Sequence, residues 1–187
     1  ERSKGGLDRQ WSTATDTWRE RQAASAISCR DAEIGYLYQT SLYLLHAHQH
    51  ENGGIPVGAY PLMWGATVHP FDASYDLMAF LGAGRLSAAE ALVDFWQAAL
   101  PARKRATAEL GLPGSHWPQD LTLGGEEFSP VRGSRAVRRA ALLEHKHFIT
   151  ANLALHVWQL YRYTGRVDLL ARHWDLIEEP LRFLLEA

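Results

Sequence analysis

The stretch ENGGIPVGAYPLMWGATVHPFDASYD, from Glu51 to Asp76, separates two segments with helical apolar spacing and decides how the chain is interpreted. It is rich in glycine, proline and aromatic residues, and its His69-Pro70-Phe71-Asp72 motif leads into the next helical segment. A second loop of similar composition, LPGSHWPQDLTLGGEEFSPVRGSR, runs from Leu112 to Arg135. Long loops on a rigid scaffold often carry functional residues. Two such loops, each leading into a helix, predict one shared pocket.

The composition is that of one globular domain covering residues 1–187. The chain has a mass of 21.0 kDa and is 47% hydrophobic, which is enough to bury a core. Its net charge of −2, from 19 basic and 21 acidic residues, gives no electrostatic reason to expect a nucleic acid or an anionic membrane as a partner. Cys29 is the only cysteine, and the N-terminus lacks the pattern of a secretory signal. We therefore expect a cytoplasmic protein.

Apolar residues recur at intervals of three and four along most of the chain, which predicts an all-α fold. Asp31 is expected to cap the second helix, and Ser87 to Glu90 to form a capping box. Pro101 and Pro180 are expected to kink or interrupt their helices. The predicted helices are Ser12–Ser28, Asp31–His50, Ser74–Leu81, Ser87–Leu110, Leu142–Thr164, and a last one from Asp168 or His173 to the end.

These helices form three predicted hairpins. Short turns at Ser28–Asp31, Gly82–Ser87 and Gly165–Asp168 are expected at one end, and the long loops at the other. This alternation is typical of an α/α toroid, in which each hairpin supplies an outer and an inner helix. Three hairpins correspond to half of an (α/α)6 toroid.

The order of several motifs carries a resemblance to a known family. They are Trp64…Phe71-Asp72…Asp76-Leu77-Met78, Leu100-Pro101-Ala102-Arg103, Gly114-Ser115-His116-Trp117-Pro118, Gly124-Gly125-Glu126-Glu127, and His147…Asn152…Trp158…Tyr161…Thr164-Gly165. In this order and spacing they resemble the central catalytic domain of glycoside hydrolase family 65, which contains maltose, kojibiose and trehalose phosphorylases and acid trehalases. The resemblance covers the chain from Asp31 to its end.

This resemblance implies an (α/α)6 barrel that cleaves α-glucosidic bonds with inversion, by hydrolysis or by phosphate attack. The family's general-acid glutamate lies just beyond the position of Ala187, so we expect the chain to be the N-terminal half of the barrel. The expected partner is the remaining half of the barrel or a second copy of the chain. The family usually has Trp-Asp where this chain has Phe71-Asp72, so a phenylalanine replaces a sugar-stacking tryptophan.

Carboxylates and aromatic rings are the residue types that glycoside cleavage needs. An inverting hydrolase uses one carboxylic acid and one carboxylate base, whereas a phosphorylase replaces the attacking water with phosphate. Sugar hydroxyls pair with carboxylates, and aromatic faces cover the apolar side of the ring. The predicted catalytic residues are Glu127 and Asp72. The predicted substrate-binding residues are Trp64, His69, Phe71, Asp76, His116, Trp117, Glu126 and His147.

Simpler structural roles remain open for these residues. Asp72 could cap the helix that follows it, and Trp117 could anchor its loop in the core. Glu127 could be a solvated loop carboxylate. His145 and His147 do not share a helix face, so we predict no metal. The basic run from Arg132 to Arg139 could meet phosphate or form a solvated helix face.

Two classes of function follow. The first is a carbohydrate-active enzyme, or half of its catalytic domain, with no cofactor other than inorganic phosphate as a co-substrate in a phosphorylase. The second is a non-catalytic α-solenoid module that binds a sugar or a protein partner.

Overall fold

The computed structural model describes residues 4–57, 67–128, 133–144 and 147–186, which form two compact units. The first unit is Glu1–His46 and the second is Ala47–Ala187. In the described residues the only regular elements are helices, with two isolated β-bridges between loop segments. The predicted all-α class is therefore confirmed. Among these residues no helix is long and apolar enough to cross a membrane.

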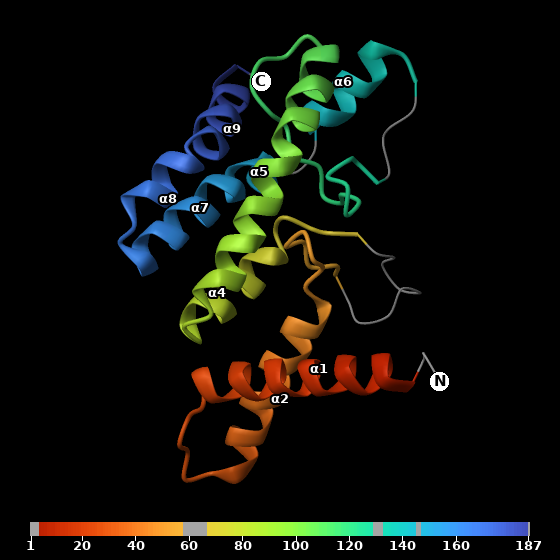
Figure 1. Cartoon of the computed structure of the whole chain (residues 1–187). Helices are drawn as coiled ribbons and strands as arrows, with labels where there is room; N and C mark the ends of the chain where they lie inside the picture. Colours follow the sequence, from red (N-terminus) through yellow and green to blue (C-terminus); the bar gives the residue numbers. More distant parts are fainter. Residues whose placement is uncertain (1–3, 58–66, 129–132, 145–146, 187) are drawn as a thin grey trace. The chain divides into compact units, whose positions relative to one another are not determined.

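The first unit consists of α1 (Lys4–Ala24) and most of α2 (Ala32–His48) (Figure 1). The Trp18 and Tyr43 rings join the two helices, with their centroids 4.7 Å apart. The Asp31 carboxylate accepts hydrogen bonds from the backbone N–H groups of Glu33 and Ile34, at 2.9 and 3.3 Å. Asp31 thus caps α2 as predicted, because its Oδ1 accepts from N–H groups that have no partner within the first turn.

The second unit contains the remaining helices. They are α4 (Ala73–Gly82), α5 (Leu86–Glu109), α6 (Arg135–Glu144), α7 (His147–Thr164), α8 (Val167–Arg172) and α9 (Asp175–Glu186). Figure 1 shows α7 beside α9 and α4 beside α5, and both pairs are in contact. The core between them holds Phe80, Trp96, Leu153, Leu176 and Phe183, none of which is exposed.

Several predicted helix boundaries were wrong. The expected capping box at Ser87 is absent, because α5 already begins at Leu86 with Arg85 at its N-cap position. Neither Pro101 nor Pro180 interrupts its helix: α5 and α9 continue through them. The predicted Leu142–Thr164 segment belongs to two helices, since α6 ends at Glu144 and α7 starts at His147.

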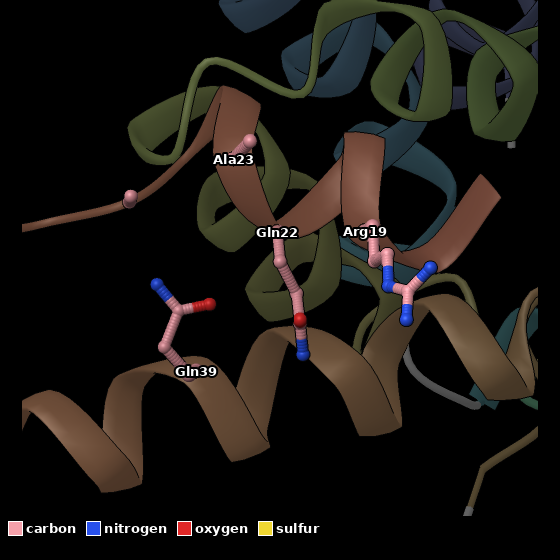
Figure 2. A pocket seen from close by; sticks show the side chains of 5 residues that line it. Arg19, Gln22, Ala23 and Gln39 are labelled. Atoms are coloured by element: carbon pink, nitrogen blue, oxygen red, sulfur yellow. The ribbon is translucent and has the colours of Figure 1, made fainter. Parts of the chain in front are cut away.

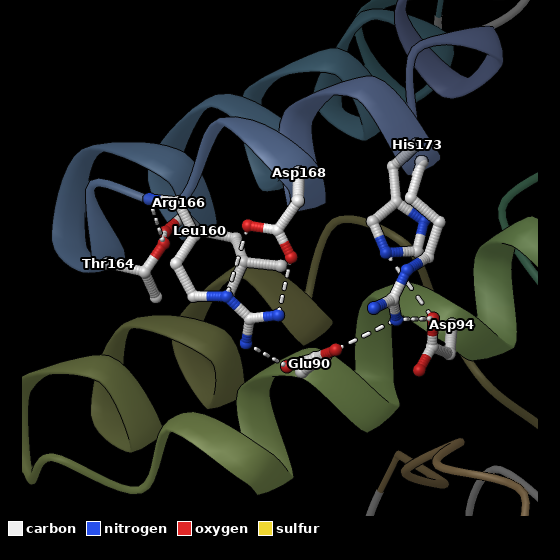
Figure 3. Close-up of polar contacts among 8 residues, drawn as sticks. Glu90, Asp94, Leu160, Thr164, Arg166, Asp168 and His173 are labelled. Carbon is white, nitrogen blue, oxygen red and sulfur yellow. Dashed lines mark hydrogen bonds and ion pairs between the residues drawn. The ribbon is translucent and has the colours of Figure 1, made fainter.

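The two short turns of this unit lie at the same end, as predicted. Arg166, in the turn between α7 and α8, donates from Nη1 to Glu90 Oε2 in the first part of α5, at 3.2 Å. Arg172 of α8 donates to the other oxygen of Glu90, at 2.8 Å. Figure 3 shows this cluster, with Asp168 on the opposite side of the Arg166 guanidinium.

The two long loops are joined by backbone pairing. Val68 and Leu121 exchange hydrogen bonds of 2.8 and 3.0 Å, and Leu121 also bridges to Glu127. Asn52 adds a side-chain bond of 2.7 Å to the carbonyl of Leu123. We call residues 67–72 and 120–128 together the loop face. Because Asp72 precedes α4 and Gly82 ends it, the loop face lies away from the short turns.

Close packing of Gly125 on α5 provides a test of this arrangement. Gly125 has a φ of +81°, and a Cβ added there would lie 2.5 Å from the Cβ of Ala99. We predict that Gly125→Ala lowers the free energy of unfolding by about 2 to 4 kcal/mol, from backbone strain and overpacking. Urea denaturation measures this loss. The matched control is Gly124→Ala, where the nearest atom is Thr122 Oγ1 at 3.4 Å and φ is not left-handed, so the change should be within about 0.5 kcal/mol. Equal losses in both variants would contradict the packing.

Candidate functional site

The first half of the loop face is organised around the buried ring of His69. Its Nδ1 lies 3.2 Å from Asp72 Oδ2, and its Nε2 lies 3.2 Å from Thr67 Oγ1. An ionised carboxylate only accepts hydrogen bonds, so Nδ1 donates to Asp72 Oδ2. His69 is predicted as a substrate-binding residue. The structure places it behind Asp72, where it orients that carboxylate.

Asp72 does not cap α4. It stands at the N-cap position with helical backbone angles, and its carboxylate accepts no hydrogen bond from the helix N–H groups. The side chain is about half exposed, at 47%. The capping alternative is therefore wrong, and Asp72 presents a carboxylate that a histidine holds and that solvent can reach.

An aromatic cluster lies beside Asp72. The Phe71 ring makes edge contacts with Tyr75 and with Phe148 of α7, at centroid distances of 5.9 and 5.4 Å. All three rings are exposed, with Phe71 at 41%. Trp64, the other aromatic residue predicted to bind substrate in this loop, lies outside the described residues.

Asp76, in the first turn of α4, differs from an ordinary surface carboxylate. Burial raises its pKa from 3.8 to about 6; the charge of Asp72 also raises it, and His48 lowers it. Asp72 and Asp76 both lie at the N-terminal end of α4, but their environments differ. Asp72 is half exposed, whereas Asp76 is largely withdrawn from water. Such pairs occur where a site needs one proton donor and one charged group.

Glu127 is the central carboxylate of the second half. The pKa of Glu127 is raised, mainly by burial and to a smaller extent by the charge of Asp120. The charges of Arg103 and Arg138 oppose this rise. Its side chain is 30% exposed, and its Oε2 lies 3.9 Å from Arg103 Nη2. The neighbouring Glu126 is exposed, and its backbone closes a tight turn with Thr122. Glu127 is therefore not a freely solvated loop carboxylate, whereas its neighbour Glu126 is exposed.

Trp117 is a structural residue. It is fully buried, its Nε1–H donates to Ser115 Oγ at 3.1 Å, and its ring packs edge-on against Trp96. Its backbone N–H donates to Thr150 of α7. No face of the indole is open to a sugar, so the substrate-binding prediction is wrong for Trp117 and the loop-anchor alternative describes it.

His116 and His147 both pack on Phe183 of α9, at centroid distances of 5.2 and 5.8 Å. Burial lowers the pKa of His116 to about 3, with further lowering by Arg103 and His147. His116 is therefore neutral at physiological pH and cannot supply a charge to a ligand. The structure places the two rings against α9, whereas the aromatic cluster of Phe71 lies against α4 and α7.

Two polar features of the structure were not predicted from the sequence. The first is Arg103, which was named from the sequence only as part of the Leu100-Pro101-Ala102-Arg103 motif. It lies on the buried face of α5, together with Leu100 and Thr107. The second feature links α4 to α7: Asn152 donates to Ser74 Oγ at 2.5 Å, and Ser74 Oγ lies 2.9 Å from Nε2 of the buried His156. No short sequence motif signals contacts of this range.

Two observations concern the described residues outside the loop face. No group of three or more potential metal-binding side chains occurs in residues 4–57, 67–128, 133–144 and 147–186. Figure 2 shows an open hollow in the first unit between α1 and α2, lined by Arg19, Gln22, Ala23, Ala26 and Gln39. It contains none of the predicted site residues.

One solved structure, described as a glycosidase in which a glutamate is replaced by alanine, is similar to this chain with a TM-score of 0.57. The fold is similar to that of this glycosidase. Sequence identity is 18%, and the match covers 84% of this chain but only 43% of the other, so the chain spans less than half of that structure. No family model matches the sequence, and a search of the curated proteins found no match either. The similarity supports a glycosidase-type fold, while membership of family 65 stays a prediction.

The environment of Asp76 predicts a pH-dependent stability. The carboxyl ionises near pH 3.8 in the unfolded chain and near pH 6 in the folded one, so the folded state binds the extra proton between these values. Stability from this group is complete below about pH 4 and is lost as the pH rises through about 6. An asparagine at this position cannot ionise, so Asp76→Asn avoids this loss. We predict that, as the pH rises from 4 to 7, the unfolding free energy of Asp76→Asn increases by about 2 kcal/mol relative to that of wild type.

Urea denaturation across this pH range measures the gain. The control is Asp175→Asn, in the first turn of α9 but exposed, which reports the effect of removing a first-turn charge without burial. A pH-independent difference between Asp76→Asn and wild type would contradict the assignment.

Proposed function

We propose that this chain is part of a carbohydrate-active enzyme that cleaves an α-glycosidic bond of a small sugar with inversion. The main support is the pairing of Val68 with Leu121, which brings the segments of Asp72 and Glu127 into one loop face. The fold that carries this loop face is similar to that of a glycosidase. Carboxylates of unequal burial beside exposed aromatic rings match the chemistry that a sugar requires.

In this proposal Asp72 accepts hydrogen bonds from sugar hydroxyls, and His69 fixes the orientation of its carboxylate. Phe71 offers an exposed ring to the apolar face of the sugar. Asp76 serves as the neighbouring group that is protonated at mildly acidic pH. Glu127 acts from the second loop, as hydroxyl acceptor or as base. The general acid of the reaction would come from a part of the barrel outside this chain.

Hydrolysis and phosphorolysis differ in the attacking group, which is water or inorganic phosphate. The basic residues of α6 do not form a closed cluster: Arg135 lies against Gly111, and Arg138 lies 3.8 Å from Glu109. These contacts support the solvated-face interpretation. We therefore favour hydrolysis, and an assay of α-linked disaccharides with and without phosphate tests this choice. Phosphate-dependent release of a sugar phosphate would overturn it.

A cytoplasmic location is part of the proposal, since Cys29 is a free and exposed thiol of the kind that a reducing compartment preserves. The second candidate function is sugar binding without turnover, which the partial coverage of the glycosidase structure favours. This function would be supported if the chain binds α-glucosides and no longer form of the polypeptide cleaves them.

We propose further that the partner is the remaining half of the barrel or a second copy of this chain. Along α7, Phe148, Leu155 and Trp158 are about half exposed. Large exposed apolar surface on one face usually marks an interface.

This predicts self-association of the isolated chain, measured by sedimentation velocity over a range of concentrations. Leu155→Glu should shift the distribution toward the monomer, because it places a charge in the interface. The control is Leu7→Glu in α1, a leucine of similar exposure in the other unit. A monodisperse wild-type monomer at all concentrations would contradict the association.

Asp72→Asn tests the proposed function directly. The amide keeps the shape of the side chain but accepts at one oxygen only, so affinity for α-glucosides should fall about 10- to 150-fold, corresponding to about 1.5 to 3 kcal/mol. Calorimetric or NMR titration measures the affinity. Because Asp72 makes no capping hydrogen bond, the unfolding free energy should change by less than about 0.5 kcal/mol.

The control for this prediction is Asp168→Asn, which removes an exposed carboxylate at the short-turn end. Its sugar affinity should equal that of wild type. A lowered melting temperature of Asp72→Asn with unchanged sugar affinity would remove Asp72 from the site.

A further inference from the structure

Arg103 is a buried cation in the C-terminal part of α5. It is 4% exposed and shares its helix face with Trp96, Ala99, Leu100 and Thr107, all buried. Within the described residues its Nε and Nη1 have no hydrogen-bond partner, and its ion pair is with Glu127. Burying a guanidinium costs several kcal/mol unless a nearby charge compensates. A carboxylate close to Arg103 Nη2 offsets part of this desolvation cost.

Glu127 supplies that carboxylate from the loop face. Its backbone position does not depend on Arg103, because Leu121 bridges to Glu127 and the Phe128 N–H donates to the Asp120 carbonyl at 3.0 Å. Arg103 therefore acts on the side chain of Glu127 rather than on the loop. The contact of 3.9 Å is electrostatic and too long for a hydrogen bond.

The other charged groups around Glu127 lie in its own loop and in α6. Asp120 and Glu126 belong to the same loop, and Arg138 comes from α6. His116 lies near Arg103 and is neutral, and both His116 and His147 pack on Phe183. Of the two cations, Arg138 is shared with Glu109 and is more exposed, at 37%. Arg103 is thus the cation best placed to hold a negative charge at position 127.

We propose that Arg103 is a positioning residue that keeps the Glu127 side chain ionised and fixes its orientation within the loop face. This inference rests on the proposed function for its use, since an ionised Glu127 is what a sugar hydroxyl or an attacking water requires. It also assigns a role: Glu127 is the charged acceptor of the loop face and not its proton donor. Burial pushes the carboxyl toward the neutral form, and the Arg103 charge opposes that push.

The test is a carboxyl 13C NMR titration of Glu127 in the 187-residue chain, with the signal assigned by its loss in Glu127→Gln. Arg103→Met removes the charge and keeps the length of the side chain, so the Glu127 midpoint should rise by about one pH unit. Arg103→Lys keeps the charge and should restore the wild-type midpoint to within about 0.3 units. The matched control, Arg138→Met, should shift the midpoint less than Arg103→Met.

Sugar affinity measured over the same pH range separates this inference from the proposed function. If Arg103 positions Glu127, the acidic limb of binding moves upward in Arg103→Met in parallel with the NMR midpoint, and Arg103→Lys reverses both. A shifted midpoint in a chain that binds no sugar supports the role of Arg103 and defeats the proposed function. An unshifted midpoint in folded Arg103→Met overturns the inference, whatever the sugar affinity.

A second measurement does not depend on the folding of Arg103→Met. Glu127→Gln leaves the buried guanidinium without its carboxylate, whereas Glu126→Gln changes an exposed neighbour on the same turn. Thermal unfolding should show a clearly larger loss for Glu127→Gln. Equal melting temperatures for the two variants would also overturn the inference.

Discussion

The antiparallel pairing of Val68 with Leu121 is the interaction on which the loop face depends. Long loops between helices leave many backbone groups without regular partners, and buried N–H and C=O groups must find them. Here each loop supplies partners for the other, and Asn52 adds a side-chain bond to the second loop. Gly125 then allows the paired loops to lie directly on α5. This pairing brings the segments of Asp72 and Glu127 next to each other.

Burial makes the two ends of the second unit behave differently although both carry many charges. At the short turns, Arg166, Glu90 and Asp168 form ion pairs with their side chains partly in water, and such pairs contribute little to stability. At the loop face, Asp76 and Glu127 are partly withdrawn from water, and their pKa values rise. Charges kept in this costly state are typical of functional sites. This difference fits the proposal that the loop face carries the chemistry.

The sequence predicted the elements whose signals are local. Asp31 caps α2 through its own backbone neighbours, and the helix α7 stops before Gly165, which has a φ of +66°. It misplaced the start of α5, because the Ser87 capping pattern competes with a first turn that already begins at Leu86. Pro101 was expected to kink or divide α5, but the helix continues through it, and Leu100 before the proline and Arg103 after it are both buried.

Apolar spacing and glycine-rich loops act over a few residues, so the sequence was sufficient to predict the all-α class and the two long loops. Which of the loop residues face solvent depends on the tertiary structure. It turned Trp117 into a core anchor, set His69 behind Asp72 and put Arg103 beneath Glu127. Exposure and charge pairing depend on contacts between segments far apart in the chain, and no local pattern encodes them.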